Sequence, residues 1–125
     1  MGELTIAVTI FMLFIAKSLN GEWLIKLYGI HIEVYYNGIL KKSIRYKDMQ
    51  SVLLASFDKN RRYLKIIDNK NKKTVVQIQY FPFMRNTEII QFDDFGSNFT
   101  ILLKPFFLQK ESINQRDKII NFYKK

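Results

Sequence analysis

The chain contains no cysteine and only one histidine, His31. Without cysteine it can form neither a disulfide scaffold nor a thiolate zinc site, and it has no cysteine nucleophile. A single histidine leaves little room for a histidine-based metal cluster or a serine–histidine–aspartate relay. These absences argue against many catalytic chemistries, so the sequence predicts a non-enzymatic protein without a cofactor or a metal site.

The chain also has no apolar run long enough for an ordinary membrane-spanning helix. Leu4–Ala16 is thirteen residues without a charge, whereas a spanning helix needs about 20 apolar residues. A signal peptide is disfavoured, because Glu3 stands where positive charge is expected and no small-x-small cleavage site follows. We therefore treat residues 1–20 as an apolar segment with three open alternatives: a membrane anchor, a buried helix or a strand. If the segment spans, the lysines after it place residues 20–125 in the cytoplasm.

Positive charge is concentrated in the middle of the chain. The 125 residues carry 20 Lys and Arg against 11 Asp and Glu, and 48% are hydrophobic, as in one globular domain. Residues 39–85 have a net charge of +9, against −1 for residues 1–38 and +1 for residues 86–125. Such a concentration attracts phosphate-rich partners, either anionic lipid headgroups or nucleic acid. The alternative is a solvated face with no ligand.

Short alternating runs separated by turn residues predict antiparallel strands from residue 21 onward. We expect strands over residues 22–28, 30–36, 39–46, 50–57, 63–67, 74–81, 87–92 and 98–103. Asn37-Gly38 is the strongest hairpin signal, because both central residues of a type I′ turn need a positive φ. Residues 68–71 and 93–97 also have turn chemistry, and Pro82 ends the strand before it.

The end of the chain predicts a helix. Ser112 with Gln115 three residues later matches a capping box, and Ile113, Ile120 and Tyr123 form one apolar face. The expected fold is therefore mainly β (α+β). It is a bent antiparallel sandwich or barrel of about seven strands, with a C-terminal helix capping one open end.

This order of elements resembles a pleckstrin-homology-like (PH-like) domain, and more specifically the small bacterial members. The likeness covers roughly residues 22–124 and lies in Gly29-Ile30-His31-Ile32, Asn37-Gly38 and residues 44–52. In that family a glycine-aliphatic strand and an aliphatic-x-Tyr-x-Asp-aliphatic-x-x-Val junction recur; here Met49 stands where isoleucine is commoner. The resemblance implies a PH-like domain over residues 21–125. Attachment to transmembrane helices is frequent in bacterial members.

The candidate residues for binding an anionic partner are basic side chains from the middle of the chain: Lys41, Lys42, Arg45, Lys59, Arg61, Arg62, Lys70, Lys72 and Lys73. The order Lys-Lys-x-x-Arg over residues 41–45 departs from the lysine and K-x-R pattern of lipid-binding PH domains. It therefore predicts diffuse contact with anionic lipid rather than specific phosphoinositide recognition. Antiparallel strands can place residues 41–42 and 61–62 on one rim, with residues 70–73 on the opposite rim.

Three functions of different classes follow from these features. The first is a PH-like binding module at the cytoplasmic face of a membrane, contacting anionic lipid or a membrane protein; if residues 4–19 belong to the core, the module is cytoplasmic. The second is a nucleic-acid-binding protein that uses residues 39–85. The third is a protein-interaction or assembly module in which an exposed strand edge accepts a partner strand.

Overall fold

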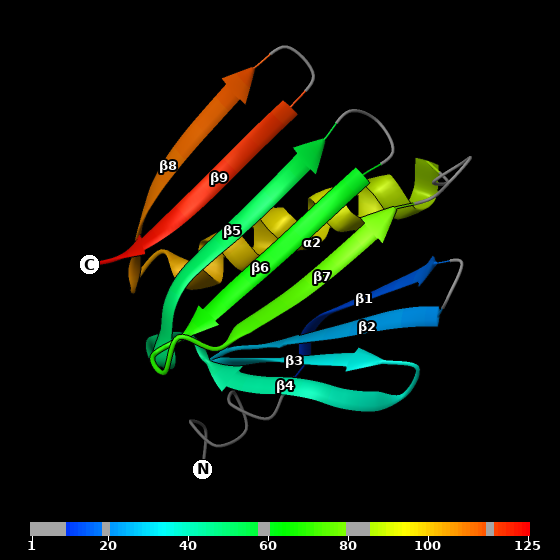
Figure 1. Cartoon of the computed structure of the whole chain (residues 1–125), viewed down its shortest axis with the longest axis horizontal. Helices are drawn as coiled ribbons and strands as arrows, with labels where there is room; N and C mark the ends of the chain where they lie inside the picture. The colour runs from blue at the N-terminus through cyan, green and yellow to red at the C-terminus, as the bar shows by residue number, and fades with distance from the viewer. Residues whose placement is uncertain (1–9, 19–20, 58–60, 80–85, 115–116) are drawn as a thin grey trace.

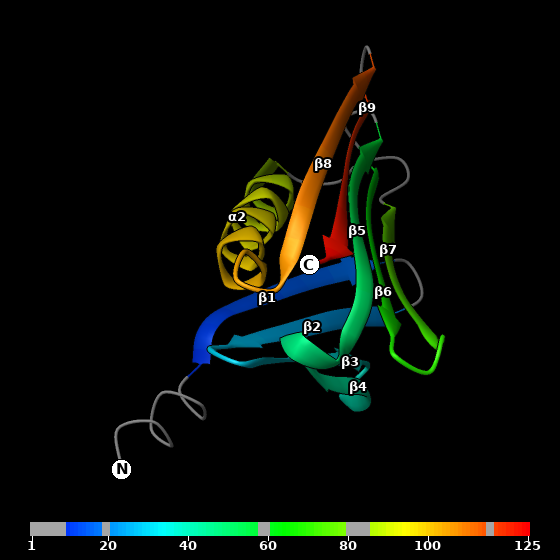
Figure 2. The same cartoon turned by 90° about the vertical axis from the view of Figure 1, so that its left-hand side faces the viewer.

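The computed structural model describes residues 10–18, 21–57, 61–79, 86–114 and 117–125. These residues form two antiparallel sheets of four and five strands, with a single α-helix, α2 (Asn86–Leu103). The expectation of a mainly β protein is confirmed. The expected count of about seven strands is not, because the described residues contain nine. Figure 1 shows the strands of both sheets, and Figure 2 shows α2 lying in the angle between the two sheets.

The first sheet is a meander in which spatial order follows chain order. Its strands are β1 (Ile10–Ser18), β2 (Gly21–Tyr28), β3 (His31–Tyr36) and β4 (Ile39–Arg45). The predicted hairpin at Asn37-Gly38 is confirmed, with φ values of 51° and 78° at the two turn residues. The Asn37 side chain accepts a hydrogen bond from the Glu22 backbone N–H at 2.8 Å. A Cβ at Gly21 would stand only 2.4 Å from that side-chain oxygen, so a larger residue here would displace the Asn37 side chain from its hydrogen bond.

The second sheet has the order β7-β6-β5-β9-β8. Its strands are β5 (Met49–Phe57), β6 (Arg61–Asp68), β7 (Lys73–Gln79), β8 (Phe107–Asn114) and β9 (Asp117–Lys124). A single 3-10 turn, η1 (Tyr46–Asp48), carries the chain from the first sheet to the second. The β8–β9 hairpin adds to the free edge of β5, so the last strands of the chain extend the sheet rather than cap it.

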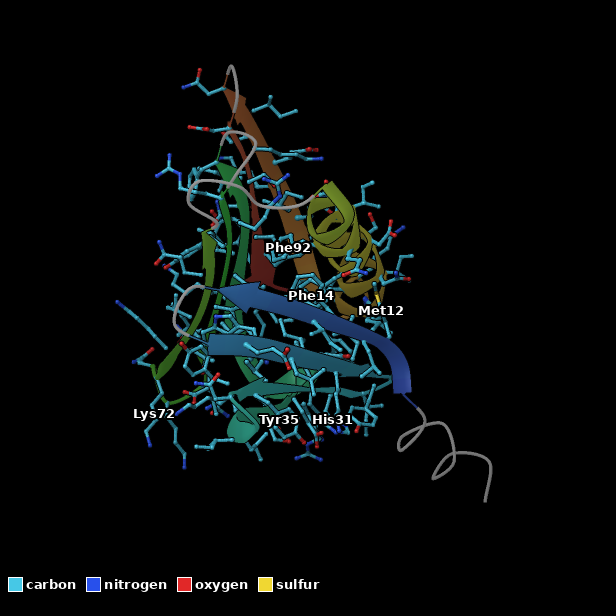
Figure 3. All side chains as sticks on the ribbon, turned by 90° about the vertical axis from the view of Figure 1, so that its right-hand side faces the viewer. Met12, Phe14, His31, Tyr35, Lys72 and Phe92 are labelled. Carbon is cyan, nitrogen blue, oxygen red and sulfur yellow. The ribbon has the colours of Figure 1, made fainter. Side chains whose placement is uncertain are left out.

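Aromatic rings from the first sheet and the helix form the centre of the core. Phe14 of β1 packs against Phe92 and Phe95 of α2, with ring centroids 5.5 and 5.7 Å apart. Phe99 stacks on Phe95 and lies 5.9 Å from the ring of Tyr46 in η1. Figure 3 shows Phe14 and Phe92 between the helix and the sheets. All five rings are buried, so the helix is anchored mainly by aromatic packing.

The prediction of two strands over residues 87–92 and 98–103, joined by a turn, is wrong. Both segments and the intervening residues belong to α2. Phe92, Phe95, Phe99 and Leu103 recur every three or four residues and are all buried, which is the spacing of one helix face. Taken alone, Asp93, Asp94 and Gly96 are residue types that favour a turn. Packing of this aromatic face against both sheets overrides that local tendency.

The prediction of a C-terminal capping helix is also wrong, because β8 and β9 occupy this part of the chain. Residues 118–123 of β9 pair with β5, with Ile120 opposite Leu54 and Phe122 opposite Val52. A capping box offers only a local hydrogen-bond exchange. Pairing with β5 satisfies the backbone of six consecutive residues and buries Phe122, so the strand is preferred.

Residues 10–18 of the N-terminal apolar run form strand β1, which is one of the alternatives for this segment. Phe14 is buried against the helix, while Leu13 and Ile15 on the other face are about half exposed, at 49% and 47%. No helix among the described residues has the length and apolar content needed to cross a membrane. Residues 4–9 of the run lie outside the described residues.

Candidate functional site

Strand β6 carries the two charged side chains that are buried in the described residues, one near each end. Arg62 is 6% exposed and Asp68 is 5% exposed. They alternate with Leu64 and Ile66, which are fully buried, and so point to the inner face of the sheet. Six residues of extended chain put the two charges about 20 Å apart, so they belong to two separate sites.

The carboxylate of Asp68 ties the β6–β7 turn to the first sheet. It accepts a hydrogen bond from Lys42 Nζ of β4 at 2.6 Å and from the backbone N–H groups of Lys70 and Lys72 at 2.8 and 2.9 Å. The hydrogen bond from Lys42, with those from the turn N–H groups, lowers the pKa of Asp68 to about 2 against the opposing effect of burial. The predicted turn at residues 68–71 is thus confirmed, with Asn71 at a φ of 64°.

Two further segments meet this turn. The Asn69 N–H donates to the carbonyl oxygen of Asp48 in η1 at 3.1 Å, and Arg45 forms an ion pair with the Asp48 carboxylate at 3.0 Å. From β9, Lys124 Nζ donates to the carbonyl oxygens of Lys47 and Met49, the latter at 3.0 Å. The end of β4, η1, the β6–β7 turn and the C-terminus therefore form one surface, at the left of Figure 1.

We call this surface the basic end. Its eight cationic side chains are Lys42, Arg45, Lys47, Lys70, Lys72, Lys73, Lys124 and Lys125. All except Lys42 are exposed, and Figure 3 shows Lys72 extending from the molecule. The carboxylates of Asp48 and Asp68 are the acidic groups that pair with them. The excess of positive charge makes this end attractive to an anionic surface.

Five of the nine predicted binding residues lie at the basic end: Lys42, Arg45, Lys70, Lys72 and Lys73. Lys41 lies on β4 nearer to the Asn37-Gly38 turn. Arg61 and Arg62 lie at the opposite end of β6, and Lys59 is outside the described residues. The expected grouping of residues 41–42 with 61–62 on one rim is therefore wrong, because Lys42 contacts the β6–β7 turn. Lys42 and residues 70–73 share one end instead of lying on opposite rims.

Sequence reasoning missed three members of the basic end. Lys47 was part of the basic middle region but was not a candidate residue. Lys124 and Lys125 fall at the end of the helix that the sequence predicts from Ser112 onward. In the structure, β9 brings the C-terminus beside η1, as the hydrogen bonds from Lys124 show. No local signal in the sequence identifies this long-range strand pairing.

A cavity of about 450 Å³ lies at the opposite end of β6, between the second sheet and α2. Cross-strand neighbours on the inner face supply its polar side: Ser56 of β5 pairs with Arg62 of β6 and with Lys118 of β9. Leu54 and Ile120, one step further along the sheet, supply apolar lining together with Phe92 of α2. Asp93 closes the helix side, with Oδ1 3.4 Å from Arg62 Nε.

The outer face of the first sheet carries a hydrogen-bonded cluster around Glu33. Its carboxylate accepts hydrogen bonds from the hydroxyls of Tyr35 and Tyr28 at 2.8 and 3.3 Å, and His31 Nε2 lies 3.6 Å away. Burial disfavours the ionised form, but the two tyrosine hydrogen bonds and His31 outweigh it, so the pKa of Glu33 is lowered. The rings of Tyr28 and His31 stack 4.2 Å apart. Because the Glu33 carboxylate, both tyrosine hydroxyls and His31 Nε2 are paired with one another, we interpret the cluster as a structural feature of the sheet.

Comparisons with known proteins provide no assignment for either end of the molecule. Among the described residues, no group of three or more His, Asp or Glu side chains could hold a metal ion. No protein-family model, no curated protein and no solved structure matches this chain.

Proposed function

We propose that this chain is a non-enzymatic PH-like binding module that contacts an anionic membrane surface at its cytoplasmic face through the basic end. The observation that supports this most directly is the meeting of eight cationic side chains from three separate segments on one end of the molecule. Each basic residue close to an anionic lipid surface contributes about 1 kcal/mol. Six such residues acting together would give stable but salt-sensitive binding.

The order of the elements supports a PH-like relationship. The four strands β1–β4 form one meander, β5–β7 form a second, and α2 follows them and packs between the two. A PH-like domain has the same order of four strands, three strands and a helix. The β8–β9 hairpin is then an addition after the helix, joined to the free edge of β5.

The rigidity of the β6–β7 turn also favours binding to a flat surface. Asp68 holds the turn by two backbone hydrogen bonds and by Lys42. Lys70, Lys72 and Lys73 therefore project from a fixed backbone, and ordering this backbone on binding costs little further entropy. Contact does not need a specific pocket for a phosphorylated headgroup, in keeping with the irregular spacing of residues 41–45.

Flotation with vesicles tests the proposal. The protein should float with phosphatidylcholine vesicles containing 30 mol% phosphatidylserine, as roughly the fraction in an anionic membrane, and not with pure phosphatidylcholine. Replacing Lys70, Lys72 and Lys73 together by Gln should weaken binding by about 100-fold, from about 1 kcal/mol for each charge. Raising the salt concentration should also weaken the binding of the unmodified protein to the anionic vesicles.

The matched control replaces three exposed cations outside the basic end, Arg61, Lys110 and Lys118, by Gln. It removes the same charge and should bind nearly as well as the unmodified chain. Equal losses for the two triple variants would show that net charge alone matters and would overturn the basic end as the site. Binding to a labelled oligonucleotide at a concentration that gives no vesicle binding would favour the nucleic-acid alternative instead.

A further inference from the structure

We infer that the basic end contacts a membrane together with an apolar strip on the outer face of the second sheet, whose side chains insert between the lipid headgroups. The strip is part of one cross-strand row and consists of Leu108 of β8, Tyr123 of β9 and Ile67 of β6, with Ser51 of β5 between the last two. This inference rests on the proposed function. It adds an apolar component to a contact that the cations alone would make purely electrostatic.

The strip lies on the face of the second sheet that points away from the core. The residue before each of its three members is buried on the inner face: Phe107, Phe122 and Ile66. Because successive residues of a strand point to opposite faces, the strip points outward. Leu108 is 59% exposed and Tyr123 is 49% exposed, and Ile67 is half-buried. Leu108 and Tyr123 are direct cross-strand partners, so they present one continuous apolar surface to solvent.

The strip borders the basic end directly. In β9, Lys124 follows Tyr123. Lys73 of β7 is the cross-strand partner of Ile67 and lies in the same row. Lys124 Nζ donates to the Met49 carbonyl oxygen at 3.0 Å, which fixes the end of β9 beside the start of β5. This junction lies near the C-terminus in Figure 1. A surface that approaches the basic end can therefore meet the cations and the strip together.

The combination of positive charge and exposed apolar surface favours an anionic lipid surface as the occupant. The cations beside the strip attract the headgroups. Tyrosine prefers the membrane–water interface, because its ring is apolar while its hydroxyl group stays hydrated. Transfer of the exposed leucine surface out of water is also favourable. A second copy of the chain docked on the strip would bring two basic ends together, and their charges would repel each other.

The opposite end of β4 provides a matched pair of apolar side chains. Ile39 and Leu40 are 61% and 49% exposed, almost the same fractions as Leu108 and Tyr123. They follow the Asn37-Gly38 turn, whereas the basic end lies at the other end of the strand. They match the strip in exposed fraction and differ from it in position.

Flotation at two salt concentrations tests the strip. Replacing Leu108 and Tyr123 together by Gln should weaken binding to the vesicles with phosphatidylserine by about tenfold, because less apolar surface leaves water. Salt screens charges but not apolar burial, so this ratio should persist when the salt concentration is raised to about 0.3 M. Replacing Ile39 and Leu40 together by Gln should leave binding unchanged. Thermal melting shows whether both variants are folded.

The absence of cysteine from the chain allows a second measurement in a nearly unmodified protein. Leu108→Cys and Leu40→Cys, each labelled with the fluorophore NBD, report whether the two positions enter the lipid. On the anionic vesicles, the emission of the label at residue 108 should shift to shorter wavelength and be quenched by spin-labelled lipids. The label at residue 40 should stay in water.

The outcomes separate this inference from the proposed function. A label at residue 108 that stays in water while the chain still floats would overturn the inference alone. So would equal flotation of the Leu108 and Tyr123 double variant and the unmodified chain. If the unmodified chain does not float, the proposed function fails and the inference fails with it. A dimer in sedimentation equilibrium that the same double variant dissociates would assign the strip to a second copy of the chain and overturn the inference.

Discussion

Each end of β6 buries one charged side chain, but the two side chains have different partners and surroundings. At the basic end, the Asp68 carboxylate is held by one lysine and two backbone N–H groups at 2.6–2.9 Å. At the cavity end, Arg62 has its carboxylate neighbour at 3.4 Å and borders open space. A charge enclosed by short hydrogen bonds stabilises the fold. A charge paired at a longer distance with a solvent-exposed carboxylate contributes less.

This contrast separates outward charges from an inward one. The basic end presents its cations outward on a backbone that Asp68 makes rigid, which suits a broad anionic surface. The cavity end presents one guanidinium inward beside an apolar wall, where it contacts Asp93 and the Arg61 carbonyl oxygen. The chain's net charge of +9 therefore has more than one role, and the predictions below test the difference between the two ends.

Phe95→Ala should give the largest loss of stability. Phe95 is fully buried and contacts Phe14, Phe92 and Phe99, and such a truncation costs about 3–5 kcal/mol. Because Phe95 anchors α2, the helix side of the cavity should loosen first. Urea denaturation measures the loss. Native-state hydrogen exchange should show faster exchange in α2 than at the Asn69 and Asn71 amides; equal acceleration at both places would contradict the separation of the two ends.

Lys42→Met should destabilise the protein more than Arg62→Met does. Removing Lys42 leaves the carboxylate of Asp68 buried without its cation, which is strongly unfavourable. Removing Arg62 leaves Asp93, whose side chain is 56% exposed and is solvated by water, so we expect a change of less than about 1 kcal/mol. Thermal melting of the two variants gives the comparison. A larger fall in Tm for Arg62→Met than for Lys42→Met would show that the fold depends more on Arg62, which would contradict this prediction.

Asp68→Asn should reduce the acid sensitivity of the fold. The pKa of Asp68 is about 2 in the folded chain and about 3.9 in an unfolded one. A lowered folded pKa contributes stability that is complete above about pH 4 and is lost as pH falls towards 2. Asp68→Asn should be less stable than the unmodified chain at pH 7, and it should lose less stability than the unmodified chain as pH falls from about 4 towards 2. Asp48→Asn, which removes the same charge from an exposed pair, is the control for unfolding measured from pH 7 to pH 2.

Gly96→Ala should give a small gain in stability. Replacing a glycine in a helix interior contributes about 0.5–1 kcal/mol, and the new Cβ meets Leu54 at an ordinary contact distance. A higher midpoint of urea denaturation would show that α2 packs against β5 without needing glycine at this position. A loss of stability would instead indicate that Gly96 is required for packing of α2 against β5.

The sequence predicted the strands β2–β7 better than the rest of the chain. Six predicted ranges from residue 22 to residue 81 overlap the strands β2–β7, and the turn residues at Asn37-Gly38 and Asp68 have the expected conformations. Local chemistry is sufficient here, because each strand pairs with its neighbour in the chain through a short turn. The expected rims were wrong, because the pairing of β4 with β3 and the contact of Lys42 with Asp68 depend on tertiary structure.

Prediction from the sequence failed where the fold depends on distant contacts. Residues 86–103 combine β-favouring side chains with a turn-like centre, yet the aromatic face at helical spacing packs against Phe14 and Tyr46. Residues 107–124 carry a capping box, yet β9 pairs with β5 more than 60 residues earlier. In both cases the free energy of tertiary burial exceeds the local preference, which amounts to only about 1 kcal/mol per signal.

The sequence by itself determined the β character, the hairpin turns and the excess of positive charge, because these depend on residue type and on neighbours in the chain. Only the tertiary structure decided which charges share a surface. It brought Lys124 and Lys125 beside residues 45–48, separated Arg62 from Lys42, and placed Arg62 against an apolar cavity under α2. Electrostatic fields and cavities depend on distances in space, and strand pairing between remote segments sets those distances.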